Sequence, residues 1–433
     1  MFTSYDTFMA EQYQRRILDG VLDGLMAEVA AISLVGPKAV GKTATATKRA
    51  QTIINLDDDL EREAYTNAAT PLKTMPGTIL IDEWQYLPAV WNEVRRAVDQ
   101  GAEPGRFILA GSAVPRHAAI HSGAGRILPV RMRPLSLAER GLGVPVVSLA
   151  ACLSGQQTNV EGATDMTFED YANEITCSGL PGVRRFSHKV RQRQLVAYVD
   201  AVVNREFADQ GLVVRRPNTL RRWLRAFAAA TATTASYTAI LDAATPGEGQ
   251  KPSAKTTIAY RDVLSSLWLL DSVSPWDPAG TAITRLSQTP KHFLADPALA
   301  ASLMGLDQQT LVGGPLEPKF GLTYGSVAGR LFEALVALSL QTYTAAVDAR
   351  VGYLRTRNGD HEVDFIVQKG QDLVAVEVKL SPRVEDKDVR HLTWLQSKLG
   401  PRLKETIVVT TGPRSYRRST DGVLVVPAVL LGP

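Results

Sequence analysis

Eight residues near the start of the chain could bind the phosphates of a nucleotide. Residues 36–43 read GPKAVGKT and match the pattern G-x-x-x-x-G-K-[ST] of phosphate-binding loops. The apolar run at 31–35 predicts a buried strand before this loop, and the residues from Lys42 onward predict a helix after it. In that setting the glycines let backbone N–H groups face the phosphates, and the helix N-terminus adds positive potential.

The loop therefore predicts ATP and Mg²⁺ as cofactors. Lys42 is expected to reach the β- and γ-phosphates, and the Thr43 hydroxyl is expected to ligate Mg²⁺. An ordinary glycine-containing turn is the alternative. The match to the motif and the predicted strand–loop–helix order both favour the phosphate-binding loop. The residues expected to contact the nucleotide are Gly36, Pro37, Lys38, Ala39, Val40, Gly41, Lys42, Thr43 and Ala44.

An acidic pair follows a second apolar run. Residues 78–81 are Thr-Ile-Leu-Ile and lead directly into Asp82 and Glu83. Since ligands of open α/β sheets bind at the carboxyl ends of the strands, the pair is expected beside the phosphate loop. Asp82 is predicted to hold Mg²⁺ through its water shell, and Glu83 to orient or deprotonate the attacking water.

A third apolar run, at 107–110, is followed by Gly111 and Ser112. Ser112 could contact the γ-phosphate or the attacking water as a catalytic residue. It could equally be a plain serine in the turn after a strand.

A second group of chemically active residues lies near the C-terminus. Residues 361–368 and 373–380 alternate apolar and polar side chains, which predicts two strands joined by a turn at 369–372. A hairpin closed across that turn places Asp364 directly opposite Glu377. Opposed residues have Cβ atoms roughly 5 Å apart, and two carboxylates there repel each other. A divalent cation is expected to offset the repulsion.

Asp364 followed by Glu377-Val378-Lys379 is the D…E-x-K pattern of PD-(D/E)XK nucleases. In such sites the metal generates hydroxide and the lysine helps to activate or position the water. A helix predicted over 327–340 contributes Glu333 as a further ligand. Glu377 and Lys379 are thus candidate catalytic residues, and Glu333, Asp364 and Glu377 are candidate metal ligands. A hairpin whose polar face merely carries both charges remains the alternative.

Length and composition indicate a globular protein of several domains. The chain has 433 residues, of which 45% are hydrophobic, and two to four domains are expected. The sequence has no run of eighteen apolar residues, so no membrane-spanning helix is expected. The N-terminus lacks a basic segment followed by an apolar one, so no secretory signal is expected. Cys152 and Cys177 lack metal-ligand spacing, which is typical of buried thiols in a reducing cytoplasm.

The pattern divides the chain into three parts. Residues 1–145 alternate strand and helix signals, which favours a parallel α/β sheet. Residues 150–320 are mostly helical, and residues 321–433 carry the hairpin. Within the middle part, a helix predicted over 256–267 is followed by the β-like segment 268–273. That order is typical of the end of a winged helix-turn-helix, which binds DNA or mediates protein contacts.

Basic residues are concentrated in the middle part, although the net charge of +4 is too small to demand a nucleic-acid partner. This cluster could neutralise a phosphate backbone, or form a solvated helix face or a contact to an acidic neighbour. Its members are Arg184, Arg185, Lys189, Arg191, Arg193, Arg205, Arg215, Arg216, Arg221, Arg222 and Arg225.

Over nearly its whole length the chain resembles the AAA-type ATPases of bacteria and archaea that carry a C-terminal domain of unknown function. The resemblance implies an α/β protein with an AAA-like P-loop ATPase core, a winged-helix middle domain and a C-terminal PD-(D/E)XK-like domain. Its carriers are GPKAVGKT (36–43), ILIDEWQ (79–85), ILAGSA (108–113), GRILPVRMRPLSLAE (125–139), SGLPGV (178–183), TPKHFLADPAL (289–299), GRLFEALV (329–336) and HEVDFIVQ…LVAVEVK (361–379).

The resemblance also bears on two single residues. Arg126 matches a glycine–arginine position of the family and could be an arginine finger or sensor, or a plain structural arginine. Lys38 stands where many members have arginine, which should not impair phosphate binding. AAA-type cores often assemble into rings, but the sequence does not count subunits, so homo-oligomerisation stays open.

These observations predict an ATP-hydrolysing enzyme coupled to a module that binds nucleic acid, with DNA as the expected form. Two hypotheses stand for the C-terminal domain. It is either a Mg²⁺-dependent nuclease or the inactive nuclease-like part of a non-cleaving regulatory switch, such as a toxin–antitoxin-like or DNA-binding factor.

Overall fold

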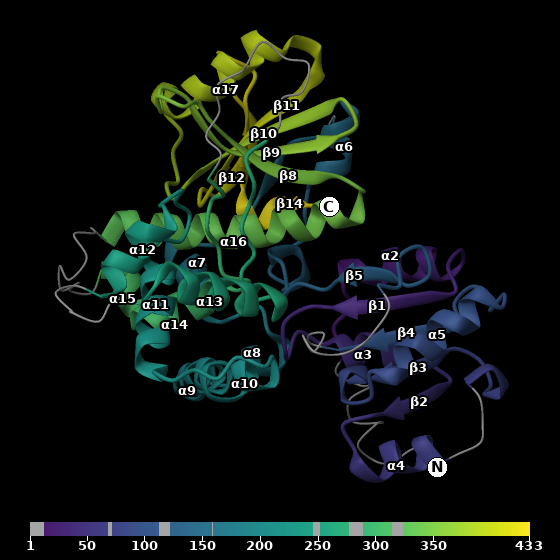
Figure 1. Ribbon diagram of the computed structural model, residues 1–433. Coiled ribbons are helices and arrows are strands. Elements are labelled where there is room, and N and C mark those ends of the chain that lie inside the picture. The colour runs from purple at the N-terminus through teal and green to yellow at the C-terminus, as the bar shows by residue number, and fades with distance from the viewer. Residues whose placement is uncertain are drawn as a thin grey trace.

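The computed structural model describes residues 13–67, 72–111, 122–157, 159–245, 252–276, 289–313 and 324–433. Ser112, one of the candidate catalytic residues, lies outside them. An N-terminal sheet, a group of helices and a C-terminal sheet follow one another along the chain (Figure 1).

The N-terminal region is a five-stranded sheet in the order β2-β3-β4-β1-β5, and every neighbouring pair is parallel. The predicted parallel α/β sheet is therefore confirmed. Strands β3 and β4 are buried along their whole length, as expected for the apolar runs of a sheet covered on both faces. The strands are β1 (Ala31–Val35), β2 (Thr52–Asn55), β3 (Ile79–Asp82), β4 (Phe107–Ala110) and β5 (Leu128–Arg131).

Helices cover both faces of this sheet. On one face Leu18 and Leu22 of α2 pack with Ile32 and Leu34. On the other face α5 presents Val90, Trp91 and Val94 to the strands, an apolar stripe with helical spacing. The helices of this region are α2 (Ile17–Met26), α3 (Lys42–Thr47), α4 (Asp59–Asn67) and α5 (Ala89–Asp99).

The middle of the chain is helical, as the sequence indicates. The helix predicted over 256–267 is observed as α13, and antiparallel bridges join Leu270 to Leu294 and Val273 to Lys291 after it. The helices are α7 (Phe168–Thr176), α8 (Pro181–Arg184), α9 (His188–Ala201), a π-helix (Val202–Glu206), α10 (Phe207–Asp209), α11 (Pro217–Ala229), α12 (Tyr237–Ala244), α13 (Ala254–Ser266), α14 (Pro297–Met304) and α15 (Gln308–Gly313).

The C-terminal region is built on a seven-stranded mixed sheet in the order β7-β12-β13-β11-β10-β9-β8. The long helix α16 packs on one face of it and α17 on the other (Figure 1). The helices are α16 (Tyr324–Ala346) and α17 (Asp386–Leu399). The strands are β8 (Arg350–Arg355), β9 (Glu362–Lys369), β10 (Asp372–Lys379), β11 (Leu403–Thr410), β12 (Arg414–Arg417) and β13 (Leu424–Pro427), with β7 (Gly162–Ala163) added at the edge.

The predicted hairpin is confirmed. Strands β9 and β10 are antiparallel and pair Leu373 with Gln368 and Val376 with Phe365, which is the predicted register; Asp364 and Glu377 are the next residues of the two strands. The inward residues of both strands are fully buried, which is why an alternating sequence specified this register.

One segment lies in a different region from the one its position in the sequence indicated. Strand β6 (Val147–Ser148) pairs with β14 (Leu431–Gly432), and β7 pairs with β12. Helix α6 (Leu149–Ser154) packs between them against β10 and β11. Residues 147–163 thus belong with the C-terminal sheet, although they precede the helical region.

Cys152 and Cys177 are free and buried, as predicted. In the part of the chain that the structure describes, no helix is both long and apolar enough to cross a bilayer.

Candidate functional site

The phosphate-binding loop joins β1 to α3 with a backbone that few residues tolerate. Gly36 has φ +153°, and a Cβ there would lie 2.2 Å from the carbonyl oxygen of Met132. Gly41 has φ +102° and precedes the first residue of α3. Ala39 also lies in the left-handed region, at φ +61°. These turns require glycine at the two ends of the loop and curve its backbone, as an anion-binding loop does.

Lys42 lies over its own loop. Its ammonium donates hydrogen bonds to the carbonyl oxygens of Gly36 at 2.9 Å and Pro37 at 3.0 Å. Burial lowers the pKa of Lys42 to about 8, an effect that Glu83 and Asp82 oppose. The ammonium is thus desolvated and held against the loop that it follows.

Thr43 and Asp82 form the pair predicted to hold magnesium. The Thr43 hydroxyl lies 2.8 Å from Oδ2 and 3.1 Å from Oδ1 of Asp82. Burial raises the pKa of Asp82 to about 6, while the hydrogen bond from Thr43 opposes the rise. A hydroxyl and a carboxylate side by side are the hard oxygen donors that Mg²⁺ binds, so these residues fit the ion.

Glu83 directly follows Asp82 at the carboxyl edge of the sheet. It is half-buried, has φ +48° and accepts a hydrogen bond from Nε2 of Gln85. The left-handed backbone turns the chain sharply after β3, a strain of the kind found at functional sites. The structure therefore brings together the four residues predicted to act on the phosphates, which are Lys42, Thr43, Asp82 and Glu83.

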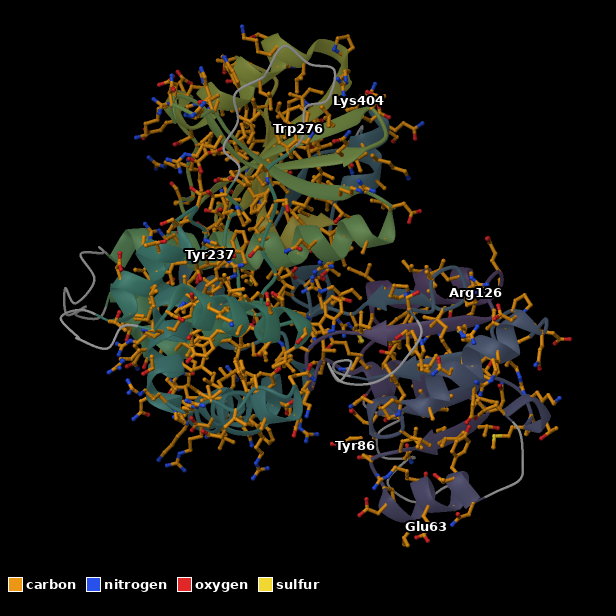
Figure 2. The ribbon with its side chains drawn as sticks, in the orientation of Figure 1. Glu63, Tyr86, Arg126, Tyr237, Trp276 and Lys404 are labelled. Carbon is orange, nitrogen blue, oxygen red and sulfur yellow. The ribbon has the colours of Figure 1, made fainter. Side chains whose placement is uncertain are left out.

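Arg126 lies apart from this group. It precedes β5, whose first residue Leu128 pairs with Ile32 near the start of β1, so Arg126 is at the amino edge of the sheet (Figure 2). The phosphate loop follows the opposite, carboxyl edge. The Arg126 guanidinium pairs with Asp99 at 2.9 Å. Arg126 is thus an arginine of the protein surface, at the edge of the sheet opposite the phosphate-binding loop of the same chain.

The helical region touches the phosphate loop directly. Glu206, at the end of the π-helix, accepts a hydrogen bond from the Lys38 ammonium at 2.5 Å. The Tyr198 hydroxyl lies 3.4 Å from the Lys38 carbonyl oxygen. Lys38 is therefore joined to the helical region by an ion pair and a tyrosine hydrogen bond.

The C-terminal region brings the four residues of the D…E-x-K hypothesis together, with Glu333 donated by α16. A fifth charged residue, Lys291, lies among them. Its Nζ is 2.8 Å from Glu333 Oε1 and 3.1 Å from Asp364 Oδ1. Glu377 is paired instead with Lys379, at 2.8 Å. Sequence reasoning missed Lys291, although it lies in the quoted segment TPKHFLADPAL.

Burial shapes the ionisation of this cluster. Burial raises the pKa of Glu333 to about 8, and Asp364 adds to the rise while Lys291 opposes it. Burial also raises the pKa of Glu377 to about 8, again with Asp364 adding and Lys379 opposing. For Lys291 burial acts to lower the pKa, but Glu333 and Asp364 outweigh it, and the pKa is raised.

A lysine ammonium lies between two of the predicted metal ligands, Glu333 and Asp364. A divalent cation between Glu333 and Asp364 would lie against the Lys291 ammonium, which already bonds both carboxylates. Within the described residues, no group of three or more His, Cys, Asp or Glu side chains is arranged to hold a metal. The Lys291 ammonium therefore offsets part of the repulsion for which a divalent cation is expected, and metal binding by Glu333, Asp364 and Glu377 stays a prediction.

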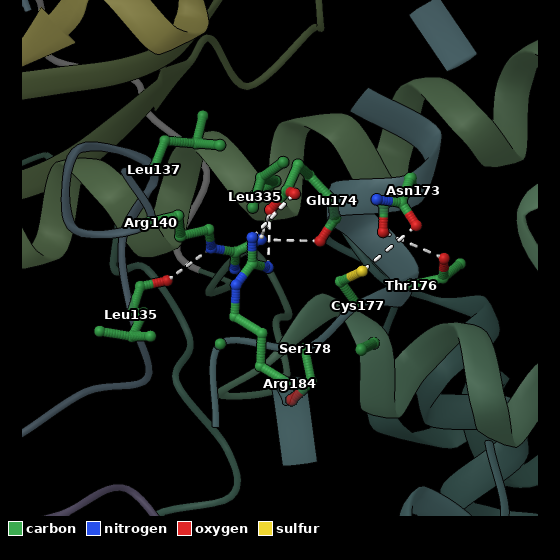
Figure 3. A network of polar contacts seen from close by, with 12 residues as sticks. Leu135, Leu137, Arg140, Asn173, Glu174, Thr176, Cys177, Ser178, Arg184 and Leu335 are labelled. Carbon is green, nitrogen blue, oxygen red and sulfur yellow. Dashed lines mark hydrogen bonds and ion pairs between the residues drawn. The ribbon is translucent and has the colours of Figure 1, made fainter. Parts of the chain in front are cut away.

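Buried ion pairs join the N-terminal region to the helical region. Glu174 of α7 bonds Arg140, which follows the N-terminal sheet, and Arg184 of α8 (Figure 3). Asp271 pairs with both Arg131 and Arg133. Arg184 therefore has a structural role in this ion pair, unlike the exposed members of the basic cluster.

The other members of the basic cluster differ in exposure. Arg221 is bound to Asp200, and Arg191 turns inward to the Phe186 carbonyl oxygen. The exposed members are Arg185, Lys189, Arg193, Arg205, Arg215, Arg216, Arg222 and Arg225.

Three stretches of the chain match known domain families. Residues 29–140 match a family described as an AAA domain. Residues 168–310 and 328–431 match two families described as domains of unknown function (DUF8612 and DUF4143).

Whole-chain comparisons find distant relatives. The chain is 24% identical over 405 residues to uncharacterized proteins of Mycobacterium tuberculosis and Mycobacterium bovis, covering 92% of this chain and 80% of theirs.

Similar solved structures include a Walker-type ATPase of Pyrococcus abyssi, at 15% identity and a TM-score of 0.41, covering 68% of this chain and 96% of that one. The ORC2 protein of Aeropyrum pernix, in its ADPNP–ADP complexes, is 14% identical with a TM-score of 0.30, covering 76% and 98%. Scores this low carry no argument. The family match and the parallel sheet of this chain support an ATPase-like AAA domain over residues 29–140.

Proposed function

We propose that the protein binds ATP with Mg²⁺ at residues 36–44 and hydrolyses it. The observation that carries this proposal is the convergence of the Lys42 ammonium and the Thr43–Asp82 pair on one phosphate-binding loop. The γ-phosphate would accept the hydrogen bonds that Lys42 now donates to its own loop. Mg²⁺ held at Thr43 and Asp82 would neutralise developing charge on the phosphates.

Glu83 is the proposed general base. It is the carboxylate next to the Thr43–Asp82 pair, one residue beyond the carboxyl end of β3. It would hold the attacking water by a hydrogen bond and take its proton as the bond to phosphorus forms. Nucleotide bound at the loop would also compete with Glu206 for Lys38, which offers a route from nucleotide state to the helical region.

Glu83→Gln tests the hydrolytic role. We expect the variant to keep its affinity for ATP and to lose turnover by about 10²–10⁴-fold, because the amide can still bind water but cannot take its proton. The measurements are phosphate release and titration with a fluorescent ATP analogue. Glu63→Gln, an exposed acid on α4, is the matched control. Unchanged turnover in Glu83→Gln would remove Glu83 from the mechanism.

We also propose that the helical region binds DNA through a winged-helix-like unit. Helices α11, α12 and α13 precede the antiparallel bridges at Leu270 and Val273. A groove of about 600 Å³ opens where α13 begins, and Arg215, Arg216 and Lys255 converge on it. Three cations in one groove would neutralise phosphates of a nucleic-acid backbone. Assembly into homo-oligomers is a separate proposal, and it is made by analogy with AAA-type proteins.

Arg215→Ala combined with Lys255→Ala tests that groove. We expect weaker binding of a duplex, measured by fluorescence anisotropy, and a salt dependence whose slope falls by about 0.9 for each lost phosphate contact. Lys404→Ala, which removes an exposed lysine from the C-terminal sheet, should leave both quantities unchanged (Figure 2). Equal affinity and equal slope in the double variant would exclude the groove as the DNA site.

A further inference from the structure

We propose that the ammonium of Lys291 is the built-in cation of the carboxylate site on the β9–β10 hairpin, so that this site needs no divalent metal and the domain does not cleave phosphodiesters. The proposal concerns the C-terminal region and does not depend on ATP hydrolysis.

The position of the ammonium is that of a shared cation. Lys291 Nζ lies 2.8 Å from Glu333 on α16, 3.1 Å from Asp364 on β9 and 3.7 Å from Glu362 on the same strand. Carboxylates that would repel one another are thus gathered around one positive charge. In a metal-dependent site the same role belongs to a divalent ion, which takes oxygen ligands from separate elements.

Lys291 is fixed in this position. Its side chain is only 1% exposed, and its ammonium lies over the rings of Tyr353 at 5.6 Å and Phe365 at 5.5 Å. Its backbone is held by hydrogen bonds in both directions with Val273, at 3.0 and 2.9 Å. A lysine so enclosed cannot swing out to admit a metal ion without opening the core between the helical and C-terminal regions.

The negative charge of Glu377, on the β10 side of the site, is offset by a different lysine. The Lys379 ammonium bonds Oε1 of Glu377, and the backbone N–H of Val378 donates to Oδ2 of Asp364 at 2.9 Å. Oε2 of Glu377 is buried without a hydrogen-bond partner among the described residues. A cavity of about 350 Å³ opens beside Asp364 and Glu377, so access for a metal can be tested directly.

The test measures Mn²⁺ binding by the full-length chain in the absence of nucleotide. Binding is detected as a decrease in the electron paramagnetic resonance signal of the free ion. Wild type should bind no Mn²⁺ at the hairpin. Lys291→Met, which keeps side-chain length but removes the charge, should gain one equivalent, and Mn²⁺ should raise its melting temperature. Lys404→Met makes the same change at an exposed lysine and should gain none. Any weak binding at Asp82 is common to all variants and cancels in the comparison.

A second comparison does not need Lys291→Met to fold. Asp364→Asn in the otherwise native chain should leave Mn²⁺ binding unchanged, because no ion is held there. Loss of a bound equivalent in Asp364→Asn would overturn the proposal. It would also be overturned by Mg²⁺-dependent cleavage of DNA or RNA by wild type that Glu377→Ala abolishes, or by a well-folded Lys291→Met that gains no Mn²⁺. None of these outcomes bears on ATP turnover, which phosphate release measures separately.

Discussion

Lys42→Ala is expected to reduce ATP hydrolysis by at least ~100-fold, the effect of removing one aimed charge from developing negative charge on a phosphoryl group. Lys42 supplies the only ammonium that lies over the loop and bonds its carbonyl oxygens, as far as the described residues show. Its desolvation means that water cannot replace it easily. Binding of ATP should weaken as well, because the same ammonium contacts the bound phosphates.

The matched control is Lys48→Ala. Lys48 caps the same short helix, α3, but is exposed and lies over the Tyr13 ring at 5.5 Å. The control removes the same charge from the same element, so its turnover should stay near that of wild type. Both variants should keep the circular dichroism spectrum of the wild type. Turnover in Lys42→Ala within a few-fold of wild type would contradict an ATPase centred on this loop.

The geometry around the phosphate-binding loop could be predicted because the sequence signals for it are local. Residues 36–43 specify a turn geometry that only glycine satisfies at two positions, and Asp82 follows an apolar strand that must be buried. Parallel pairing through β4 then places both at one edge of the sheet. The hairpin was predictable for a similar reason, since alternation with a period of two allows one register.

The contacts that define the C-terminal site could not be predicted in the same way. Lys291 lies 42 residues from Glu333 and 73 from Asp364 in sequence, and no periodic pattern links them. The charge repulsion between Asp364 and Glu377 was correctly inferred, but a side chain and a metal ion both satisfy that requirement. Distinguishing them needs the packing of the segment that carries Lys291 against β9.

Domain assembly was also outside the reach of sequence patterns. Residues 147–163 join the C-terminal region by two strand pairings of two residues each, β7 with β12 at the edge of the large sheet and β6 with β14 in a separate two-stranded sheet. Pairings so short leave no alternation to read. Likewise, the local sequence around Glu174 does not indicate that its side chain is buried. A glutamate on a helix is usually exposed to solvent.

Glu174→Gln is expected to lower the free energy of unfolding by about 3–5 kcal/mol, the cost of removing one partner from a buried ion pair. The side chains of Arg140 and Glu174 are 0% and 5% exposed, so the arginine would be left charged and without its carboxylate. Although burial acts to raise the pKa of Glu174, Arg184 and Arg140 hold it below its ordinary value. The stabilisation is therefore present above the ordinary carboxylate pKa and lost as the pH falls below it.

Thermal and urea unfolding at neutral pH measure this effect, with Glu169→Gln as the control. Glu169 is exposed on the same helix, α7, and its loss should change stability by no more than ~0.5 kcal/mol. Arg140→Met in the Glu174→Gln background should recover part of the loss, because it removes the buried charge that the first change leaves unpaired. If Glu174→Gln unfolds at the wild-type midpoint, the pair does not fasten the ATPase region to the helices. If the double variant is no more stable than Glu174→Gln, the loss does not come from an orphaned guanidinium, and the join must depend on the apolar contacts around it.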